Sequence, residues 1–460
     1  MNKPLQMPMF KPETEWVPPT HLPDLKDHKE IAIDLETRDP NLTTMGSGSV
    51  RRDGEVIGIA VAVEGWSGYF PINHEGGGNM DRALVLDWFE EVLHTQATKI
   101  FHNAMYDVSW IRSMGFQIQG GIIDTMIAAS LCNENRWSYT LDSVAKEYIG
   151  MGKNEKLLQE AAKSWGINPK SEMWRLPAPL VGEYAEQDAV VTLKLWTAMK
   201  HELSKQDLWD VFNLETNLFP CLVDMKFKGV RVDVVKAEET KKSLAITEKD
   251  MHRDIQKLAG FDVEIWAAAS IAKAFDKVKL PYDRTEKGAP SFTKNFLATH
   301  PHELPKLINQ AREINKANTT FIETILKHEH NGRIHSDINQ IRSDDGGTVT
   351  GRFSYSNPNL QQIPARHKEL GPLIRSLFIP ETGTKWGCFD YSQQEPRILV
   401  HFSSLLRLEG SQMIVDQYNA GEADFHQMIA DMAGIERKQA KTINLGLMYG
   451  MGKNKLMAEL

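Results

Sequence analysis

The stretch IAIDLET, residues 31–37, decides which fold the first part of the chain adopts. Its β-branched isoleucines predict a short strand. Asp34 and Glu36 are two residues apart on this strand, so both carboxylates project from the same face. Two oxygen ligands for a cation are therefore expected to lie side by side.

The surrounding segments predict a mixed α/β domain. GEVIGIAVAVEGWSGYFPI (54–72) is expected to form two strands joined through Gly65, and KIFHN (99–103) is expected to form another. Segments 81–97 and 122–132 are expected to be helices. We place this domain at residues 28–204, after a proline-rich lead at 1–27.

Two later segments of this domain add acidic and aromatic side chains. FHNAMYD (101–107) ends in Asp107, and EYAEQDAVVTLKLW (183–196) places Tyr184 and Asp188 four residues apart on one face of a predicted helix. Hydrolysis of a phosphodiester by two metal ions needs several carboxylates around ions about 4 Å apart. Each motif alone is more often a solvated strand edge or an ordinary helix face.

The order D-x-E, N-x-x-Y-D, Y-x-x-x-D resembles the DEDD exonucleases in their tyrosine-bearing form, over residues ~28–200. The resemblance implies an RNase H-like domain, a mixed sheet with flanking helices, that cuts nucleotides from the 3′ end of DNA. It also implies that Tyr184 orients the attacking water and that Asn103 and Tyr106 lie near the 3′-terminal nucleotide. The implied ligands of two Mg²⁺ or Mn²⁺ ions are Asp34, Glu36, Asp107 and Asp188.

The chain changes character after this domain. Residues 205–345 contain long charged amphipathic stretches that predict helices, such as 234–260. Strand-like GTKWGCFDYS (383–392) then leads into helical EPRILVHFSSLL, and 425–460 is expected to be largely helical.

TVTGRFSYSNPNLQQIPAR (348–366) is by composition a polar loop, and its Arg352 is suited to phosphate and sugar contacts. The string closely resembles the T-x-T-G-R-x-S…P-N-L-Q-x-I-P segment of family A DNA polymerases, the bacterial polymerase I group. FDYSQQEPRIL (389–399) resembles motif A of the same family. The resemblance implies that Asp390 and the Tyr391 carbonyl bind metal and that Glu395 crowds the sugar 2′ position.

RKQAKTINLGLMYG (437–450) spaces Arg437, Lys441, Leu445 and Tyr449 four residues apart, which on a helix makes one stripe. From spacing alone, an amphipathic core helix with snorkelling basic residues explains this pattern better than a ligand site does. The string resembles motif B. By that resemblance the two cations bind the triphosphate and the tyrosine lies beside the templating base. Leucine replaces the usual Phe or Tyr, which should alter how the nucleotide sugar is sensed. His426 is expected to be a further phosphate contact.

The resemblance implies a right-hand polymerase: a mostly helical thumb at 205–345, a partial palm at 346–407 and partial fingers at 408–460. The sequence stops at Leu460, before the His-Asp pair of motif C. We therefore expect only exonuclease activity from this chain alone, because Asp390 would have to hold two metals unaided. A partial gene and a split gene completed by a second polypeptide carrying motif C both fit, whereas the intact motifs argue against a degenerate remnant.

The resulting hypothesis is a proofreading DNA polymerase acting in DNA replication, with primer–template DNA, single-stranded 3′ ends and dNTPs as partners. One alternative is a free-standing 3′–5′ exonuclease with a nucleic-acid-binding C-terminal half. Another is a DNA-binding accessory subunit with a vestigial metal site.

Bulk composition adds little to this choice. The net charge of −8 gives no general attraction to DNA, so local cations or metal ions must supply it. Three scattered cysteines without CxxC spacing favour a reducing compartment, and no stretch approaches 18 apolar residues. We expect no membrane contact and a place in the cytoplasm of a bacterial or phage-infected cell.

Overall fold

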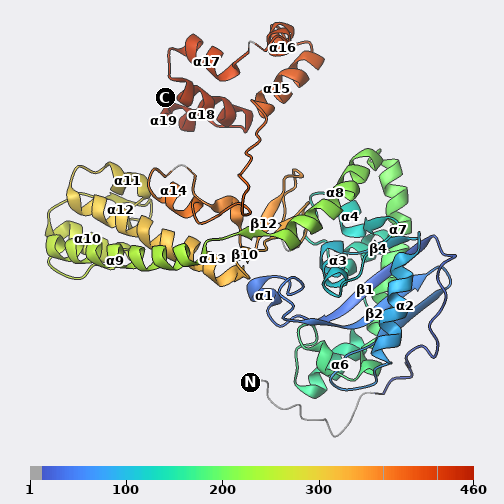
Figure 1. The fold of residues 1–460 in the computed structure, drawn as a ribbon. Coiled ribbons are helices and arrows are strands. Elements are labelled where there is room, and N and C mark those ends of the chain that lie inside the picture. Colours follow the sequence, from blue (N-terminus) through green and yellow to red (C-terminus); the bar gives the residue numbers. More distant parts are fainter. Residues whose placement is uncertain (1–12, 345, 366, 422, 460) are drawn as a thin grey trace. The chain divides into compact units, whose positions relative to one another are not determined.

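The computed structural model describes residues 13–344, 346–365, 367–421 and 423–459, so much of the predicted lead lies outside the described residues. The chain divides into two compact units, Met1–Glu381 and Thr382–Leu460. Each unit is described by itself below (Figure 1). The finer domain boundaries proposed from the sequence remain predictions.

A five-stranded mixed sheet organises the first unit. Strand β1 (Glu30–Arg38) lies at its centre, antiparallel to β2 (Glu55–Val63) and parallel to β4 (Thr98–Phe101). The edges are β3 (Trp66–Pro71) and β5 (Ile122–Asp124), in the order β3-β2-β1-β4-β5. The strands predicted at 30–37, 54–72 and 99–103 are thereby confirmed.

Alternation along β1 sends its side chains to two different cores. Ile31 and Ile33 pack with helices α2 (Arg82–His94) and α3 (Ala104–Ser113) on one face of the sheet. Ala32 belongs to the opposite core, which contains α7 (Gly182–Lys205). Because side chains alternate with a period of two, Asp34 and Glu36 project on the same side as Ala32, toward α7.

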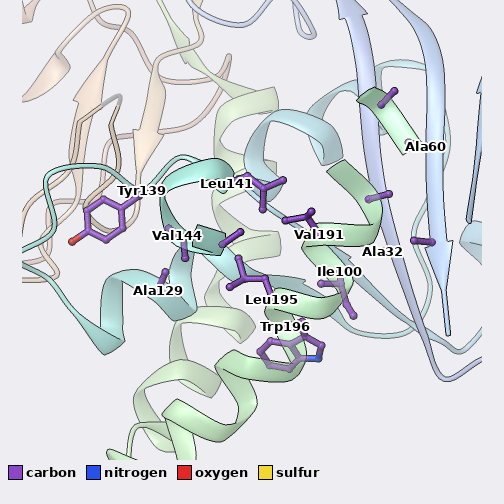
Figure 2. Close-up of a cluster of buried hydrophobic side chains, with 14 of the residues drawn as sticks. Ala32, Ala60, Ile100, Ala129, Tyr139, Leu141, Val144, Val191, Leu195 and Trp196 are labelled. Atoms are coloured by element: carbon purple, nitrogen blue, oxygen red, sulfur yellow. The ribbon is translucent and has the colours of Figure 1, made fainter. Parts of the chain in front are cut away.

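Small side chains allow α7 to pack close to the sheet. Figure 2 shows Val191 and Leu195 of α7 among residues from three strands, Ala32, Ala60 and Ile100. All five are essentially inaccessible to solvent. Burial on this scale, at roughly 25 cal/mol per Å² of apolar surface, fixes α7 against β1. The position of α7 in turn fixes Tyr184 and Asp188, which lie in its first two turns.

The remaining elements of the first unit are mostly helical, as predicted for 205–345. Its other α-helices are α1 (Leu42–Met45), α4 (Thr125–Cys132), α5 (Leu141–Ile149), α6 (Lys156–Trp165), α8 (Trp209–Lys228), α9 (Val234–Ala259), α10 (Ala268–Lys277), α11 (Lys294–Thr299), α12 (Glu303–Lys316), α13 (Glu323–His328) and α14 (Leu370–Arg375). Short turns are the 3₁₀ helices η1 (Met173–Arg175), η2 (Ala178–Leu180) and η4 (Leu360–Gln362), and the π-helix η3 (Ala317–Ile322). Small ribbons pair β6 (Val230–Arg231), β10 (Arg333–Ile334) and β9 (Glu329–His330); β11 (Asp337–Asn339) and β12 (Ser354–Ser356); and β7 (Asp283–Arg284) and β8 (Pro290–Ser291).

The second unit is helical wherever it has regular structure in its described part. It contains α15 (Gln394–Leu405), α16 (Ser411–Asn419), α17 (Phe425–Ala433), α18 (Arg437–Met448) and α19 (Lys453–Glu459). The helices predicted at 395–406 and in 425–460 are confirmed. None of the helices described in either unit combines the length and apolar character needed to cross a membrane.

Two expectations about secondary structure were wrong. Residues 383–392, predicted as a strand, are irregular, and Phe389 in that segment is 97% exposed. A strand needs a neighbour to pair its backbone N–H and C=O groups, and no such neighbour is described in this unit. The helix predicted at 122–132 begins only at Thr125, because Ile122–Asp124 pairs with β4 as strand β5.

Candidate functional site

Three carboxylates converge where β1 meets α7. One oxygen from each of Asp34, Glu36 and Asp188 lies within 4.8 Å of the others. Glu36 and Asp188 are buried, and Asp34 is half-buried. The two predictions that placed pairs of side chains on one face of a strand and of a helix therefore meet at a single site.

Asp107 reaches this site from another element. It lies in the first turn of α3, and its Oδ1 accepts a hydrogen bond of 3.0 Å from the backbone N–H of Leu35. Strand β4 pairs with β1 only as far as Ala32, so the outer half of β1 has an open edge on that side. The Asp107 carboxylate accepts a hydrogen bond from one otherwise unpaired N–H of that edge, that of Leu35. Leu35 stands between Asp34 and Glu36 in β1, so this hydrogen bond holds Asp107 beside both acids.

Burial raises the pKa of all four carboxyl groups, and repulsion from another acid of the cluster adds to this for Asp34, Glu36 and Asp107. Burial is the main cause for Asp34, the charge of Asp188 adds to it and Lys153 opposes it, giving a pKa of about 7. The pKa values of Glu36 and Asp107 rise well above their usual range, through burial first and Asp34 second. Burial also raises the pKa of Asp188, and Lys153 partly offsets this. The group therefore favours bound cations or protons.

The donor set fits a divalent metal ion. All four side chains offer carboxylate oxygens, which are the ligands that Mg²⁺ and Mn²⁺ prefer. Asp188 Oδ1 is also buried and has no hydrogen-bond partner among the described residues. An isolated buried carboxylate oxygen is costly, and coordination of a cation would remove that cost.

The predicted nucleotide contacts lie beside the cluster. A cavity of about 1110 Å³ is lined by Glu36, Asn103 and Tyr106, and by parts of the β11–β12 hairpin. Tyr106 and Thr37 share a hydrogen bond of 2.6 Å between their hydroxyl groups. Asn103 has a left-handed backbone (φ 68°) at the start of α3. The cavity is larger than most small-molecule pockets, which hold about 300–1000 Å³.

Two polar residues of this site were missed from the sequence. Lys153, between α5 and α6, forms an ion pair with Asp188 and donates a hydrogen bond of 3.1 Å to the Tyr184 hydroxyl. Asp124, at the end of β5, accepts hydrogen bonds from the backbone N–H groups of Asn103 (3.0 Å) and Ala104 (2.8 Å). No motif or spacing links either residue to its partners, which lie 20 or more positions away.

The basic stripe predicted in the second unit lies on a helix. Arg437, Lys441 and Leu445 belong to α18, and Tyr449 follows its last turn. Arg437 Nη2 lies 2.8 Å from Asp424 Oδ2, and Tyr449 donates a hydrogen bond of 2.5 Å to Glu395.

The other predicted polymerase residues differ in their burial. His426 is buried and its Nδ1 lies 3.2 Å from Asn444 Nδ2. Burial lowers the pKa of His426, as do the charges of Lys441 and Arg437. Asp390 and Arg352 are exposed, and Tyr391 is 81% exposed. Within the described ranges, Asp390 does not belong to any group of three or more close metal-ligating side chains.

Comparisons with known families match both parts of the chain. The model described as "DNA polymerase family A" matches residues 234–460, and the one described as "3'-5' exonuclease" matches residues 20–204. These two matches include all the residues singled out in both units.

Several individual proteins are similar over almost the whole chain. A DNA-directed DNA polymerase of Pseudomonas phage M6 is 38% identical, over 99% of this chain and 72% of the relative. A DNA polymerase DpoZ of Salmonella phage PMBT28 is 31% identical, over 95% of this chain and 72% of the relative. The solved POL domain of Pol1 from M. smegmatis, in complex with DNA primer-template and dNTP, has a TM-score of 0.71 at 21% identity, over 95% of this chain and 70% of that chain.

Proposed function

The chain belongs to DNA polymerase family A and carries a 3′–5′ exonuclease domain, and we propose that its carboxylate cluster removes nucleotides from the 3′ end of DNA. The observation that carries the proposal is the approach of Asp34, Glu36 and Asp188 to within 4.8 Å beside a large cavity. The match of the polymerase family to 234–460 speaks against a free-standing exonuclease.

The residues that would hold the metals are Asp34, Glu36, Asp107 and Asp188. Two bound Mg²⁺ or Mn²⁺ ions would activate a water molecule and stabilise the charge that develops on the leaving 3′ oxygen. The chain supplies the ligands already oriented, since β1, α3 and α7 are all packed in the same unit. Preorganised ligands need no rearrangement during the reaction.

The remaining residues of the site would position the DNA and the water. Tyr184 directs its hydroxyl toward Lys153 at the edge of the cluster, where it would orient the attacking water. Asn103 and Tyr106 line the cavity and would hold the 3′-terminal nucleotide. The amide of Asn103 is suited to hydrogen bonding with the nucleotide. The aromatic ring of Tyr106 is suited to contact with a base or sugar.

We further propose that the second unit contributes to nucleotide addition. Arg437 and Lys441 would bind the triphosphate of a dNTP with help from His426, and Tyr449 would lie beside the templating base. In the same proposal Asp390 and Tyr391 are metal ligands, and Glu395 and Leu445 sense the sugar. Arg352, a residue of the first unit, would contact the DNA. Support comes from the family match and from the M. smegmatis structure, whose partners are DNA primer-template and dNTP.

Replacing Asp34 by alanine tests the exonuclease proposal. With Mg²⁺ or Mn²⁺, the wild-type chain should shorten a 5′-labelled single strand from its 3′ end. Asp34→Ala should slow this about 1000-fold or more, because a metal ligand contributes several kcal/mol to catalysis. Glu64→Ala, which removes an exposed acid from the β2–β3 turn, is the matched control. Unchanged shortening by Asp34→Ala would overturn the assignment.

A further inference from the structure

Lys153 is placed beside the acid cluster by two hydrogen bonds of its own loop. Its backbone N–H donates to Asp142 Oδ1 of α5 at 2.8 Å. The carbonyl of the preceding Gly152 accepts a hydrogen bond of 2.9 Å from Gln187, which directly precedes Asp188 in α7. The loop is therefore attached to both helices that flank the site, and the lysine is held by backbone contacts as well as by its side chain.

The side chain of Lys153 is largely shielded from solvent. It is 19% exposed, and the side chain of Asp188, with which it forms an ion pair, is 3% exposed. A lysine is rarely buried unless its charge is paired, because desolvation of an ammonium group is costly. The Lys153 ammonium also lies 5.1 Å from the centre of the Tyr184 ring. Lys153 thus contacts both residues that α7 contributes.

The two oxygens of Asp188 have different surroundings. Lys153 pairs with Oδ2, whereas Oδ1 is buried without a hydrogen-bond partner in the described structure. A cation on Oδ1 and the lysine on Oδ2 can therefore be held by the same carboxylate. Lys153 does not need to leave for a metal to bind.

The charges expected at the loaded site balance only if one further positive group is present. Four carboxylates and one phosphodiester carry five negative charges, and two divalent ions supply four positive ones. The Lys153 ammonium is the fifth, and it contacts the cluster through its ion pair with Asp188. Because a buried site tolerates little net charge, this balance favours retention of the lysine during the reaction.

The contact with Tyr184 suggests what the lysine does. An ammonium group has only donors, so Lys153 occupies an acceptor position on the phenolic oxygen. The Tyr184 hydroxyl is then oriented to act as a donor. We propose that Lys153 is a positioning residue of the exonuclease, which fixes the orientation of Tyr184 while Asp188 holds the lysine in place. This inference rests on the proposed exonuclease function.

The test compares Lys153→Met, Lys153→Arg and the control Lys163→Met, an exposed lysine on α6. At saturating Mg²⁺, Lys153→Met should lower kcat for release of 3′ nucleotides roughly 10- to 100-fold and leave KM almost unchanged, since a charge-assisted hydrogen bond is lost. Lys153→Arg should retain most of the wild-type kcat. An unchanged kcat, or a loss confined to KM, would overturn the proposal.

A double-mutant cycle identifies the residue through which Lys153 acts. In a Tyr184→Phe background, Lys153→Met should cost less than threefold in kcat, because the hydroxyl that the lysine orients is already absent. A full additional loss in that background would contradict the inference. Active wild type with an inactive Asp34→Ala and an unaffected Lys153→Met would refute the inference alone, whereas inactive wild type would refute the proposed function.

Two binding measurements separate positioning from simpler roles. In Ca²⁺, the affinity of Lys153→Met for a single-stranded oligonucleotide should remain within about twofold of wild type, and a large loss would make Lys153 a DNA contact instead. Calorimetric titration of the metal-free protein with Mn²⁺ should give a Kd within about threefold of wild type. Much tighter Mn²⁺ binding with unchanged kcat would mean that the lysine only occupies the place of a cation, which refutes the proposal.

Discussion

The acid cluster of the first unit and the basic stripe of the second differ most in burial. Glu36 and Asp188 are 7% and 2% exposed as whole residues, whereas Tyr449 of the stripe is 68% exposed. The cluster is positioned by a sheet and helices that share two cores. In the stripe, Arg437 and Lys441 are exposed residues of α18, and Leu445 is half-buried. Packing therefore fixes the geometry of the acid cluster, whereas the exposed side chains of the stripe have fewer packed neighbours to hold them.

The glycine opposite Glu36 shows how closely the first site is packed. Glu36 pairs with Gly58 across β1 and β2. A Cβ atom added at Gly58 would lie 2.0 Å from the hydroxyl oxygen of Tyr69. That hydroxyl is hydrogen-bonded to His74 at 2.6 Å. The core thus excludes even one methyl group beside the cluster, which is typical of interiors packed at crystal-like density.

The largest expected effect contrasts one carboxylate from each unit. Asp188→Asn should slow exonuclease release from single-stranded DNA about 1000-fold, because it removes a charge from the proposed metal site. Asp390→Asn should leave the rate within about twofold. The measurement is single-turnover shortening of a 5′-labelled oligonucleotide in Mg²⁺. Equal effects of the two variants would break the distinction between the sites.

Sequence patterns were sufficient wherever the structure follows a local period. The strand at 30–37 and the pairing of Tyr184 with Asp188 depend on periods of two and 3.6 residues, and both were confirmed. The polymerase family, which the motifs suggested, is confirmed as well. The strand expected at 383–392 was wrong, because strand formation depends on a partner that local sequence does not encode.

The residues that could not be predicted act through tertiary contacts. Lys153 meets Asp188 across 35 positions, and Asp124 meets Asn103 across 21. Both contacts form only when segments distant in sequence pack together in the folded domain, so no local pattern reveals them. The chemical roles assigned from the resemblance, and the second polypeptide with motif C, stay predictions.

The second largest effect concerns metal binding. At 100 times its Kd, one Mn²⁺ ion should raise the free energy of unfolding of the first unit by about 2.7 kcal/mol, because only the folded state assembles the ligands. Asp34→Asn should lose most of this gain, and Asp390→Asn should keep it. Tryptophan fluorescence can follow the transition, because only Trp386 of the eleven tryptophans lies in the second unit. Equal stabilisation of both variants would place the metal elsewhere.

A third prediction concerns acid sensitivity inside the first unit. Burial lowers the pKa of His74 to about 4, from an ordinary value of 6.5. Above pH 6.5 the imidazole is neutral in both states, so it imposes no penalty. As the pH falls from 6.5 toward 4, the unfolded state binds the proton first and stability is lost, by roughly 3–4 kcal/mol at most.

His74→Gln should therefore flatten the fall in stability between pH 7 and pH 5, relative to wild type. Urea unfolding at several pH values, followed by tryptophan fluorescence, measures the difference and cancels the contributions of the other titrating groups. His201→Gln is the control, because His201 is an exposed residue of α7. A parallel pH dependence of His74→Gln and wild type would show that His74 does not limit acid stability.

The smallest expected effect is on the stability of the second unit. Arg437 and Asp424 are 47% and 38% exposed in their ion pair, and pairs with such exposure contribute about 0–1 kcal/mol. Arg437→Gln should therefore change hydrogen exchange of α18 by less than about fivefold, while dNTP binding weakens about tenfold or more because the proposed phosphate contact is lost. Lys438→Gln, its exposed neighbour, should alter neither. A large rise in exchange with Arg437→Gln would mean that the pair organises α17 and α18, and the exposed site would then depend on packing as the buried one does.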